Sequence, residues 1–330
     1  MTTEMAELYD DLDHGFRPIN FLLPWAPLPQ NRRRDMAHEK MRAIYMDIIK
    51  ERRKRITADP SYKDKIEPDM IWNLMDCVYK SGTGQPIPDS EIANMMITIL
   101  MAGQHSSSSA SAWIMLELAA HPKMAEEVYQ EQLRNVVDAN GNLRPLEHSD
   151  LDKCPLLQNV VKETLRVHSS IHTIMRKVKN PIPVPNHPDG LVITPDKVLL
   201  ASPIVTHMSE EYFPDASKWD PHRWETYNPS TDGIDVAEDT VDYGYGAVSK
   251  GTKSPYLPFG AGRHRCIGEK FAYVNLCTIV ATLVREFRFG RDYKSAGLDR
   301  LVPETDYTSL FSRPKAPALI RWERREKKVF

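Results

Sequence analysis

Apolar residues at helical spacing characterise the first part of the chain and predict helices there. The apolar residues that share one helix face are Met41, Ile44, Tyr45, Ile48 and Ile49. The charged run 51–55 continues this helix as a solvated end rather than as a nucleic-acid patch. Segment 7–13 has the pattern of a helix end, and 70–79 that of another short helix. The pattern therefore predicts an α-helical beginning.

The most informative pattern predicts one long helix over 89–121, which Asp89 or Ser90 can cap. At 1.5 Å per residue such a helix spans roughly 50 Å. A helix of that length is expected to cross the centre of the fold. Two more helices, 124–137 and 156–168, are predicted after it.

The pattern changes after these helices. The apolar runs 191–193 and 198–200, separated by a Pro-Asp-Lys turn, predict a β-hairpin. Segment 225–251 is acidic and rich in Gly, Ser and Thr, which predicts a surface insertion. A last helix is predicted over 268–286. The fold class is therefore mainly α with a small β component.

The composition of the chain excludes several classes of protein. Of the 330 residues, 41% are hydrophobic and 27% are charged, which excludes a disordered or collagen-like chain. The net charge of -2 provides no overall electrostatic footprint for nucleic acid, so no nucleic-acid partner is expected. The longest apolar stretch, 95–102, is far shorter than the ~20 residues of a membrane span. The 4 cysteines lack Cys-x-x-Cys spacing, which indicates a reduced compartment.

The strongest chemical motif is the string 258–268, Pro-Phe-Gly-Ala-Gly-Arg-His-Arg-Cys-Ile-Gly. Gly260 and Gly262 permit a tight loop. Cys266 follows at the start of the last helix, where the helix dipole and flanking arginines favour a thiolate. A thiolate is a soft anionic ligand suited to iron, and Gly268 would let a flat macrocycle approach the backbone closely.

Other interpretations of this cysteine have less support. A structural cysteine beside a glycine turn would not require the whole string Phe-Gly-x-Gly-x-x-x-Cys-x-Gly. Zinc would need a second Cys or His pair near His264 and Cys266, and the sequence has none at ligand spacing. A cysteine hydrolase would need a partner base, and no residue pattern marks one.

The string resembles the haem-binding signature of the cytochrome P-450 superfamily, in which the cysteine thiolate is the proximal iron ligand. The resemblance implies the C-terminal part of a cytochrome P-450 fold and haem b as the cofactor. It also implies that haem is bound by the signature residues Cys266, Phe259, Gly260 and Gly268.

A second motif is the pair Glu163 and Arg166 on the helix over 156–168. Residues at i and i+3 share a helix face and can form an ion pair. Such a pair is usually an exposed salt bridge that contributes little to stability. On this helix, however, the apolar neighbours would bury it. Arg223 lies where the superfamily has a Pro-x-Arg-Phe-like element, and the resemblance implies a structural triad of all three.

The third motif is the small-residue segment 102–109, Ala-Gly-Gln-His-Ser-Ser-Ser-Ser, within the long helix. Gly and Ser are poor residues for a helix interior. One interpretation is a close helix crossing that requires small side chains. The other is a local bulge that leaves room for O2 and supplies hydroxyls for proton relay. The resemblance assigns the catalytic role to His105 and Ser106, with Ser106 replacing the usual Thr.

Three strings narrow the resemblance to the fungal sterol 14α-demethylases: 102–105, 172–177 and 262–268. The similarity extends from about residue 6 to about residue 322. It implies that Arg176 and His264 bind haem propionates, as a cationic fork and a donor suit carboxylates. The residues expected to line the sterol pocket are Ala102, Ile174, Met175, Leu310 and Phe311. On the residues alone, these apolar positions could equally be ordinary core.

The activity implied by the resemblance is oxidation of the sterol 14α-methyl group with O2 in ergosterol biosynthesis. NADPH-cytochrome P-450 reductase would supply electrons and dock near Arg265 and Lys270. Family members associate with the cytoplasmic face of the endoplasmic reticulum membrane, so membrane association is expected for the full-length protein.

The resemblance also implies missing parts, because family members carry an N-terminal anchor, a first β-sheet and further helices. Residues 1–330 are therefore expected to be the C-terminal portion of one haem-thiolate monooxygenase domain, with lid helices over 1–55 and the haem-ligand loop and helix over 258–286. One alternative is an inactive truncated remnant or a mis-started gene product with weak or no haem binding. Another is a haem-thiolate enzyme that isomerises peroxides.

Overall fold

The computed structural model describes residues 2–17, 19–20, 23, 25–65, 67, 69–79, 84–184, 187–226, 240–242, 247–249, 254–291, 301–308 and 310–326. Contacts divide the chain into two compact units, Met1–His105 and Ser106–Phe330. Within the described ranges, no helix combines the length and hydropathy that crossing a bilayer requires.

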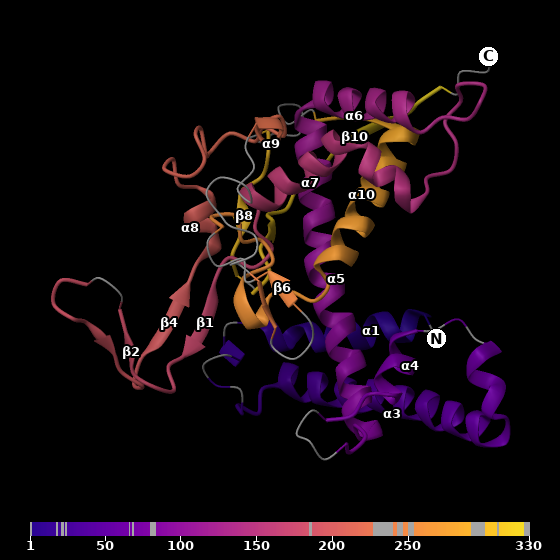
Figure 1. The fold of residues 1–330 in the computed structure, drawn as a ribbon, viewed down its shortest axis with the longest axis vertical. Coiled ribbons are helices and arrows are strands. Elements are labelled where there is room, and N and C mark those ends of the chain that lie inside the picture. The colour runs from indigo at the N-terminus through magenta and orange to yellow at the C-terminus, as the bar shows by residue number, and fades with distance from the viewer. Residues whose placement is uncertain are drawn as a thin grey trace. The chain divides into compact units, whose positions relative to one another are not determined.

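The first unit is mainly helical in the parts described. Its elements are α1 (Thr2–Asp13), η1 (His14–Phe16), α3 (Pro29–Ala58), η2 (Pro60–Lys65), α4 (Met70–Met75) and the first half of α5 (Asp89–Ala120). Helix α1 packs along α3, as Figure 1 shows. The predicted helix segments at 7–13 and 41–55 therefore belong to α1 and α3.

Two small apolar cores hold this unit together. In one, Met41 of α3 is fully buried with Leu8 of α1 and Met101 of α5. In the other, Ile49 of α3 packs with Trp72 of α4. The predicted apolar face of α3 is thus its packing face, although its member at position 48 is 36% exposed.

Helix α4 is shorter than the predicted 70–79. It begins where the Asp69 carboxylate accepts a hydrogen bond from the Trp72 amide at 3.0 Å, a standard N-cap. It ends at Met75, because Val78 then pairs with Pro86 in an antiparallel bridge. The apolar residues beyond Met75 are therefore part of a bridged turn.

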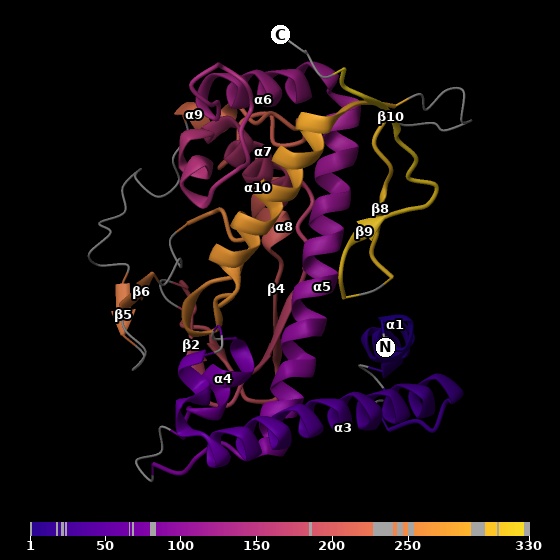
Figure 2. The same cartoon turned by 90° about the vertical axis from the view of Figure 1, so that its right-hand side faces the viewer.

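The second unit is built on the second half of α5. Its other helical elements are α6 (Pro122–Asn135), η3 (His148–Lys153), α7 (Pro155–Val167), α8 (Pro203–His207), α9 (Arg223–Thr226), η4 (Gly262–His264) and α10 (Glu269–Glu286). Figure 2 shows α10 running beside the later part of α5, with α6 and α7 next to them. The predicted helices over 124–137, 156–168 and 268–286 are confirmed within two residues.

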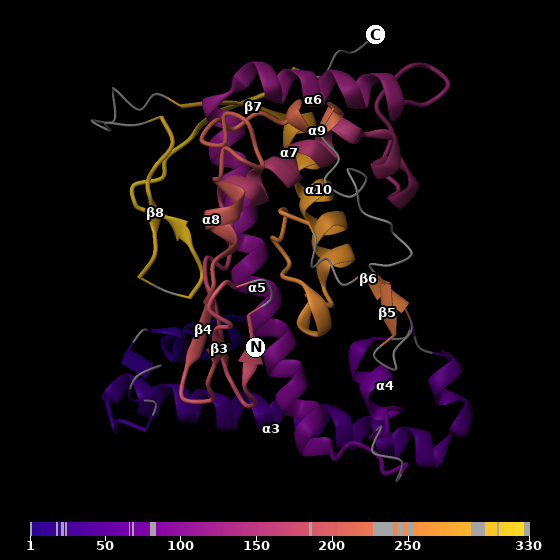
Figure 3. The ribbon, with the colours of Figure 1, turned by 60° about the vertical axis from the view of Figure 1, so that its left-hand side comes forward.

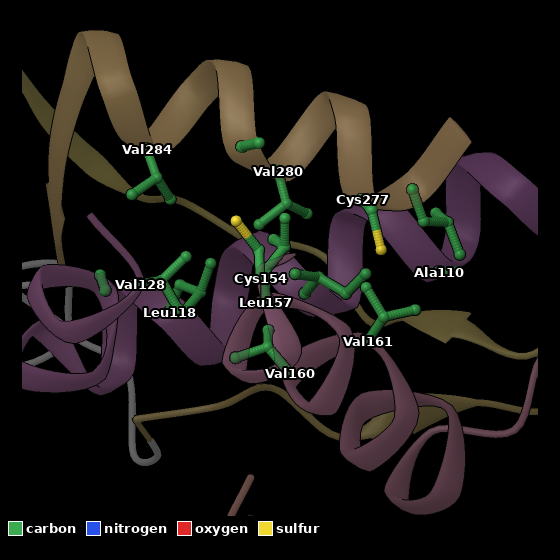
Figure 4. Packing of buried hydrophobic residues seen from close by; sticks show 14 of the residues in the cluster. Ala110, Leu118, Val128, Cys154, Leu157, Val160, Val161, Cys277, Val280 and Val284 are labelled. Carbon is green, nitrogen blue, oxygen red and sulfur yellow. The ribbon is translucent and has the colours of Figure 1, made fainter. Parts of the chain in front are cut away.

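One apolar core joins these helices. Ile114 and Leu118 of α5, Leu157 and Val161 of α7 and Val280 of α10 are all fully buried in it. Figure 4 shows the side chains of α10 and α7 pointing toward one another, with those of α5 behind them. Burial of this apolar surface fixes the start of α10, and so the segment that carries Cys266.

The strands form small antiparallel ladders of two strands each. The ladders are β1 (Ile174–Lys177) with β4 (Val198–Ala201), β2 (Ile182–Pro183) with β3 (Val192–Ile193), β5 (Thr240–Asp242) with β6 (Ala247–Ser249), β7 (Phe287–Gly290) with β10 (Arg321–Arg324), and β8 (Thr305–Asp306) with β9 (Arg313–Pro314). The prediction of a mainly α fold with a small β component is confirmed.

The predicted hairpin between 191–193 and 198–200 is wrong, although both segments contain strands. Strand β3 pairs with β2, whereas β4 pairs with β1, and Figure 1 shows β1 and β4 side by side. The turn between β3 and β4 does form, with the Lys197 amide donating to the Thr194 carbonyl at 3.1 Å. The partners come from earlier in the chain, and such non-local pairing leaves no mark in the local pattern.

Two further expectations concern α5 and the insertion. Helix α5 matches the predicted 89–121 and is α-helical over its whole length. Of the two interpretations of segment 102–109, the local bulge is therefore wrong. Of the predicted insertion 225–251, the structure describes 225–226 and the strand pair β5 and β6 (Figure 3). The rest of that prediction lies outside the described residues.

Shortening a side chain of this core is expected to lower the free energy of unfolding. Replacing the fully buried Leu157 by Ala is expected to lower the free energy of unfolding by about 2–5 kcal/mol, because it leaves a cavity between α7 and α10. Leu319, 62% exposed, is the matched control, and its change to Ala should cost no more than ~0.5 kcal/mol. Urea unfolding of both variants measures the difference, and equal losses would contradict this assignment of the core.

Candidate functional site

Residues 256–268, called the cysteine loop below, lead into α10. The Cys266 amide donates to the Phe259 carbonyl at 2.9 Å, which closes the loop on itself. Gly260 and Gly262 both have φ of 69°, a left-handed conformation that strains other residues. Gly268 is the N-cap of α10. The loop therefore holds Cys266 just ahead of a helix N-terminus, as predicted.

The four cysteines differ in their surroundings. Cys154 and Cys277 lie in the core, where burial raises the pKa of their thiols to about 11 and about 12, respectively. Cys266 is exposed. Its neighbour Arg265 forms an ion pair with Glu269 at 2.7 Å, so this cation is shared with a carboxylate and acts less on the thiol than the sequence alone indicates. Cys266 is thus an accessible thiol beside the positive end of α10.

The residues around Cys266 fit an iron-bound macrocycle. A side chain at Gly268 would begin 3.7 Å from the Cys266 sulfur, so glycine keeps the space beside the sulfur open. The next apolar residues, Ile267 and Phe271, are 97% and 73% exposed. A soft sulfur ligand flanked by exposed apolar side chains is the donor set and surface that a haem requires.

The predicted pair Glu163 and Arg166 on α7 is fully buried. Arg166 donates to both carboxylate oxygens of Glu163, at 2.8 and 3.0 Å. It also donates to three backbone carbonyls, those of His207 (2.7 Å), Ala216 (2.7 Å) and Lys218 (3.0 Å). A buried guanidinium is tolerated only when its donors are satisfied, and here the bidentate pair and three carbonyls use them.

The Glu163 carboxylate collects further donors from the segment 220–224. It accepts from the Asp220 amide at 3.0 Å and from the Trp224 indole at 3.0 Å. Arg223 approaches it at 3.4 Å and donates to the carbonyls of Pro214 and Asp215. The structure thus brings together the predicted three residues, with Trp224 as an additional donor that the sequence analysis missed.

Strand β1 lies next to the cysteine loop. A side chain at Gly260 would begin 3.9 Å from the Ile174 Cδ1 atom. Arg176 follows two residues later on the same face of the strand, because side chains alternate along a strand. It is exposed, as are Met175 and His264. The structure therefore places Ile174 and Arg176 on the side of β1 that faces the loop.

Predicted pocket residues Leu310 and Phe311 lie beside the end of α7. Phe311 is 8% exposed and bridges to Ile171, and the Ser312 amide donates to the Ser170 carbonyl at 2.9 Å. The Ser170 hydroxyl donates to the carbonyl of Ser106 at 3.5 Å. In α5 the Ser109 hydroxyl donates to the Ser312 carbonyl. At least one serine of the predicted relay segment, Ser109, thus donates its hydroxyl proton to a backbone carbonyl.

Ala102 and His105 belong to the first unit, whereas Ser106 begins the second. The His105 Nε2 atom lies 3.0 Å from an Asp13 carboxylate oxygen, and the ring lies 5.0 Å from that of Tyr9. Burial, with a contribution from Asp13, raises the pKa of Tyr9 to about 12. The partnership of His105 with Ser106 at an oxygen site stays a prediction.

Two residues that no sequence pattern marked hold the cysteine loop in place. His207, at the end of α8, is fully buried and accepts a hydrogen bond from the Leu257 amide at 2.8 Å. The Tyr256 hydroxyl donates to the Lys162 carbonyl at 3.1 Å and lies 3.1 Å from the Tyr273 hydroxyl. No short sequence motif includes the partners of His207 and Tyr256, because these partners lie on segments that are distant along the chain.

Comparisons with known proteins show which family and which relatives this chain is similar to. The cytochrome P450 family model matches residues 1–318. The sterol 14-alpha demethylase of Gibberella zeae is 66% identical over 327 residues, which cover 99% of this chain and 61% of that protein. The eburicol 14-alpha-demethylase of Penicillium italicum is 56% identical over 331 residues, with 98% and 60% covered. The chain thus spans about three fifths of the length of these relatives.

Solved structures with a similar fold are more distant in sequence. Retinoic acid bound cyanobacterial CYP120A1 has a TM-score of 0.72 at 21% identity, with 97% of this chain and 63% of that chain covered. A cytochrome P450, CYP102L1, has a TM-score of 0.71 at 20% identity, with 94% and 62% covered. These likenesses concern the fold.

The buried pair predicts a large loss of stability for Glu163→Gln. Removing the negative charge leaves the Arg166 guanidinium buried without its counter-charge, which is expected to cost about 3–5 kcal/mol. Glu286→Gln is the matched control, because Glu286 pairs with Arg324 at 3.3 Å where both side chains are solvated. That change should cost less than about 1 kcal/mol. Denaturant unfolding compares the two variants, and a loss below 1 kcal/mol for Glu163→Gln would contradict the assignment.

The imidazole of His207 predicts a pH dependence of stability. Burial lowers its pKa from 6.5 to about 4, so the folded chain binds this proton less readily than the unfolded chain does. The stabilisation is present above pH 6.5 and is lost as the pH falls toward 4, with a magnitude on the order of 3 kcal/mol. His207→Gln should flatten this part of the stability profile, measured by urea unfolding at a series of pH values. An unchanged profile in the variant would refute the assignment.

Proposed function

The chain belongs to the cytochrome P450 family, and from this premise we propose that it is the haem-thiolate part of a sterol 14α-demethylase. The identity of 66% with the Gibberella zeae enzyme over nearly the whole chain carries the proposal. The exposed Cys266 ahead of α10 supports the reaction class.

In this proposal Cys266 binds the iron of haem b. Gly268 and Gly260 keep side chains away from the macrocycle, and Phe259 fixes the loop through its carbonyl. Arg176 and His264, both exposed, bind the propionates, since a guanidinium and an imidazole suit carboxylates. Haem bound through a thiolate supplies the electron density that favours O–O cleavage.

The protein side chains supply binding, orientation and protons. Glu163, Arg166 and Arg223 hold the segments behind the loop and touch no substrate. His105 and Ser106 are proposed to deliver protons on the oxygen side. The His105 Nε2 atom lies 3.0 Å from an Asp13 carboxylate oxygen, and this contact supports the role because it orients the imidazole.

The substrate is proposed to be a sterol that carries a 14α-methyl group. Met175 is 50% exposed and lies beside Ile174, whose side chain adjoins the loop. Phe311 bridges to the segment just before them. These residues, with Leu310, would supply an apolar wall to a rigid apolar ring system. Ala102 belongs to the first unit, and its place in the pocket stays a prediction.

NADPH-cytochrome P450 reductase is proposed as the electron donor. Lys270, the second residue of α10, is exposed. It is the cation that we propose for contact with an acidic partner, because Arg265 is already paired with Glu269. Association with the endoplasmic reticulum membrane is proposed by analogy with the family. It would bring the site to an apolar substrate and to this partner.

The test compares Cys266→Ala with Cys77→Ala, because these two cysteines are the exposed ones of the four. The chain is expressed with haem supply and assayed with reductase, NADPH and a 14α-methyl sterol. Cys266→Ala is expected to abolish product and the absorption of the reduced carbon monoxide complex typical of thiolate-bound haem. Cys77→Ala should retain both.

Two results would refute the proposal. One is thiolate-type absorption that survives in Cys266→Ala. The other is an unaltered chain that binds haem through Cys266 yet leaves the 14α-methyl group of every sterol offered intact.

A further inference from the structure

We infer that His207 is a positioning residue for the cysteine loop, with its imidazole tying Leu257 to the end of α7. The inference rests on the proposed function, in that the loop matters because Cys266 binds haem. His207 lies 59 residues before Cys266 in the chain and belongs to none of the three sequence motifs.

The backbone and side chain of His207 contact different parts of the site. Its carbonyl accepts from the Arg166 guanidinium at 2.7 Å. Its Nε2 atom accepts from the Leu257 amide at 2.8 Å. One fully buried residue thus connects the buried ion pair with the start of the cysteine loop.

The hydrogen bonds determine the tautomer. An amide N–H only donates, so Nε2 must carry a lone pair and the proton of a neutral imidazole lies on Nδ1. Nδ1 lies 3.2 Å from the Arg166 carbonyl and 3.0 Å from the Ser169 hydroxyl, both of which accept. The neutral tautomer therefore satisfies both ring nitrogens.

The surroundings keep the ring neutral. The charged group that faces it from α7 is Arg166, whose counter-charge is Glu163. The titratable group that faces it from the loop is Tyr256, with ring centroids 5.6 Å apart. Phe213 covers another side at 6.4 Å and carries no charge. Burial and the nearby guanidinium both disfavour a second positive charge.

The connection continues from Leu257 to the cysteine. Leu257 is two residues before Phe259, and the Phe259 carbonyl accepts from the Cys266 amide. The Leu257 carbonyl itself accepts from the Gly260 amide at 3.1 Å. A shift of Leu257 would therefore move the Gly260 amide and the Phe259 carbonyl, and with them the backbone of Cys266.

The test uses two substitutions that keep different halves of the imidazole. His207→Gln can place an amide oxygen near the Nε2 position and keep an acceptor for Leu257. His207→Asn reaches only the Nδ1 position and leaves the Leu257 amide without a partner. A purely structural role for His207 predicts that the two variants behave alike.

Two measurements are made on each variant. Hydrogen exchange of the Leu257 amide, on the chain without haem, is expected to accelerate at least about fivefold in His207→Asn, the loss that corresponds to one buried hydrogen bond. It should stay within about twofold of the unaltered chain in His207→Gln. With haem, His207→Asn should lower the fraction of thiolate-type carbon monoxide complex, and His207→Gln should retain it.

The two measurements separate this inference from the proposed function. If the chain binds no haem, the proposed function is refuted. Hydrogen exchange of the Leu257 amide still tests the role of His207, because it is measured without haem. Unchanged Leu257 exchange in His207→Asn, or equal acceleration in both variants, would overturn the inference.

A measurement on the unaltered chain covers the case in which His207→Asn does not fold. Protonation converts Nε2 from an acceptor to a donor, so the protection factor of the Leu257 amide should fall between pH 6.5 and 4. The protection factor of the buried Val280 amide in α10 is the internal control and should change less. Equal changes at both amides would overturn the inference.

Discussion

The rest of the second unit depends on one constraint: a carboxylate and a guanidinium buried without water must have every donor and acceptor satisfied. Glu163 and Arg166 neutralise each other, but a bidentate pair alone leaves donors on one side and lone pairs on the other. The missing partners come from backbone groups between His207 and Asp220, from Trp224 and from Arg223. The pair therefore holds an irregular segment in place by hydrogen bonds, while Phe213 and Trp219 of that segment are buried as well.

The cysteine loop is attached to this gathered segment and to α10. His207 contacts both Arg166 and Leu257, and Tyr256 connects the loop to α7 through Lys162 and to α10 through Tyr273. The far end of the loop is fixed by α10, whose apolar face is buried in the core. Cys266 is thus exposed at a site whose supports are buried, which is the arrangement expected of a ligand that must be reachable and still held in one place.

The sequence was informative where chemistry or packing is local. Helices α5, α7 and α10 follow from apolar spacing, and Cys266, Glu163 and Arg166 follow from motifs a few residues long. The hairpin was wrong because β3 and β4 take partners from earlier in the chain. The bulge, one of two interpretations of segment 102–109, was wrong because α5 stays α-helical there. One serine of that segment, Ser109, instead donates a hydrogen bond to the Ser312 carbonyl.

Other parts of the site could not be predicted, for a related reason. His207 and Tyr256 hold the loop through hydrogen bonds to backbone atoms about 50 and about 90 residues away. A backbone amide or carbonyl is present at almost every position, so the identity of its partner residue is not encoded in any spacing. Trp224 directly follows the predicted Arg223 in the sequence, and its indole N–H donates to Glu163. A hydrogen-bond donor next to a predicted member of the triad is a signal that the sequence does contain.

The most direct test of the central claim is X-ray absorption at the iron edge of the haem-loaded chain and of its Arg166→Lys variant. A lysine keeps the charge but cannot form the bidentate pair and donate to three carbonyls at once. We expect one sulfur ligand on the iron of the unaltered chain and a reduced sulfur occupancy in the folded variant. A sulfur shell that is absent from the unaltered chain, or that is identical in both proteins, would contradict it.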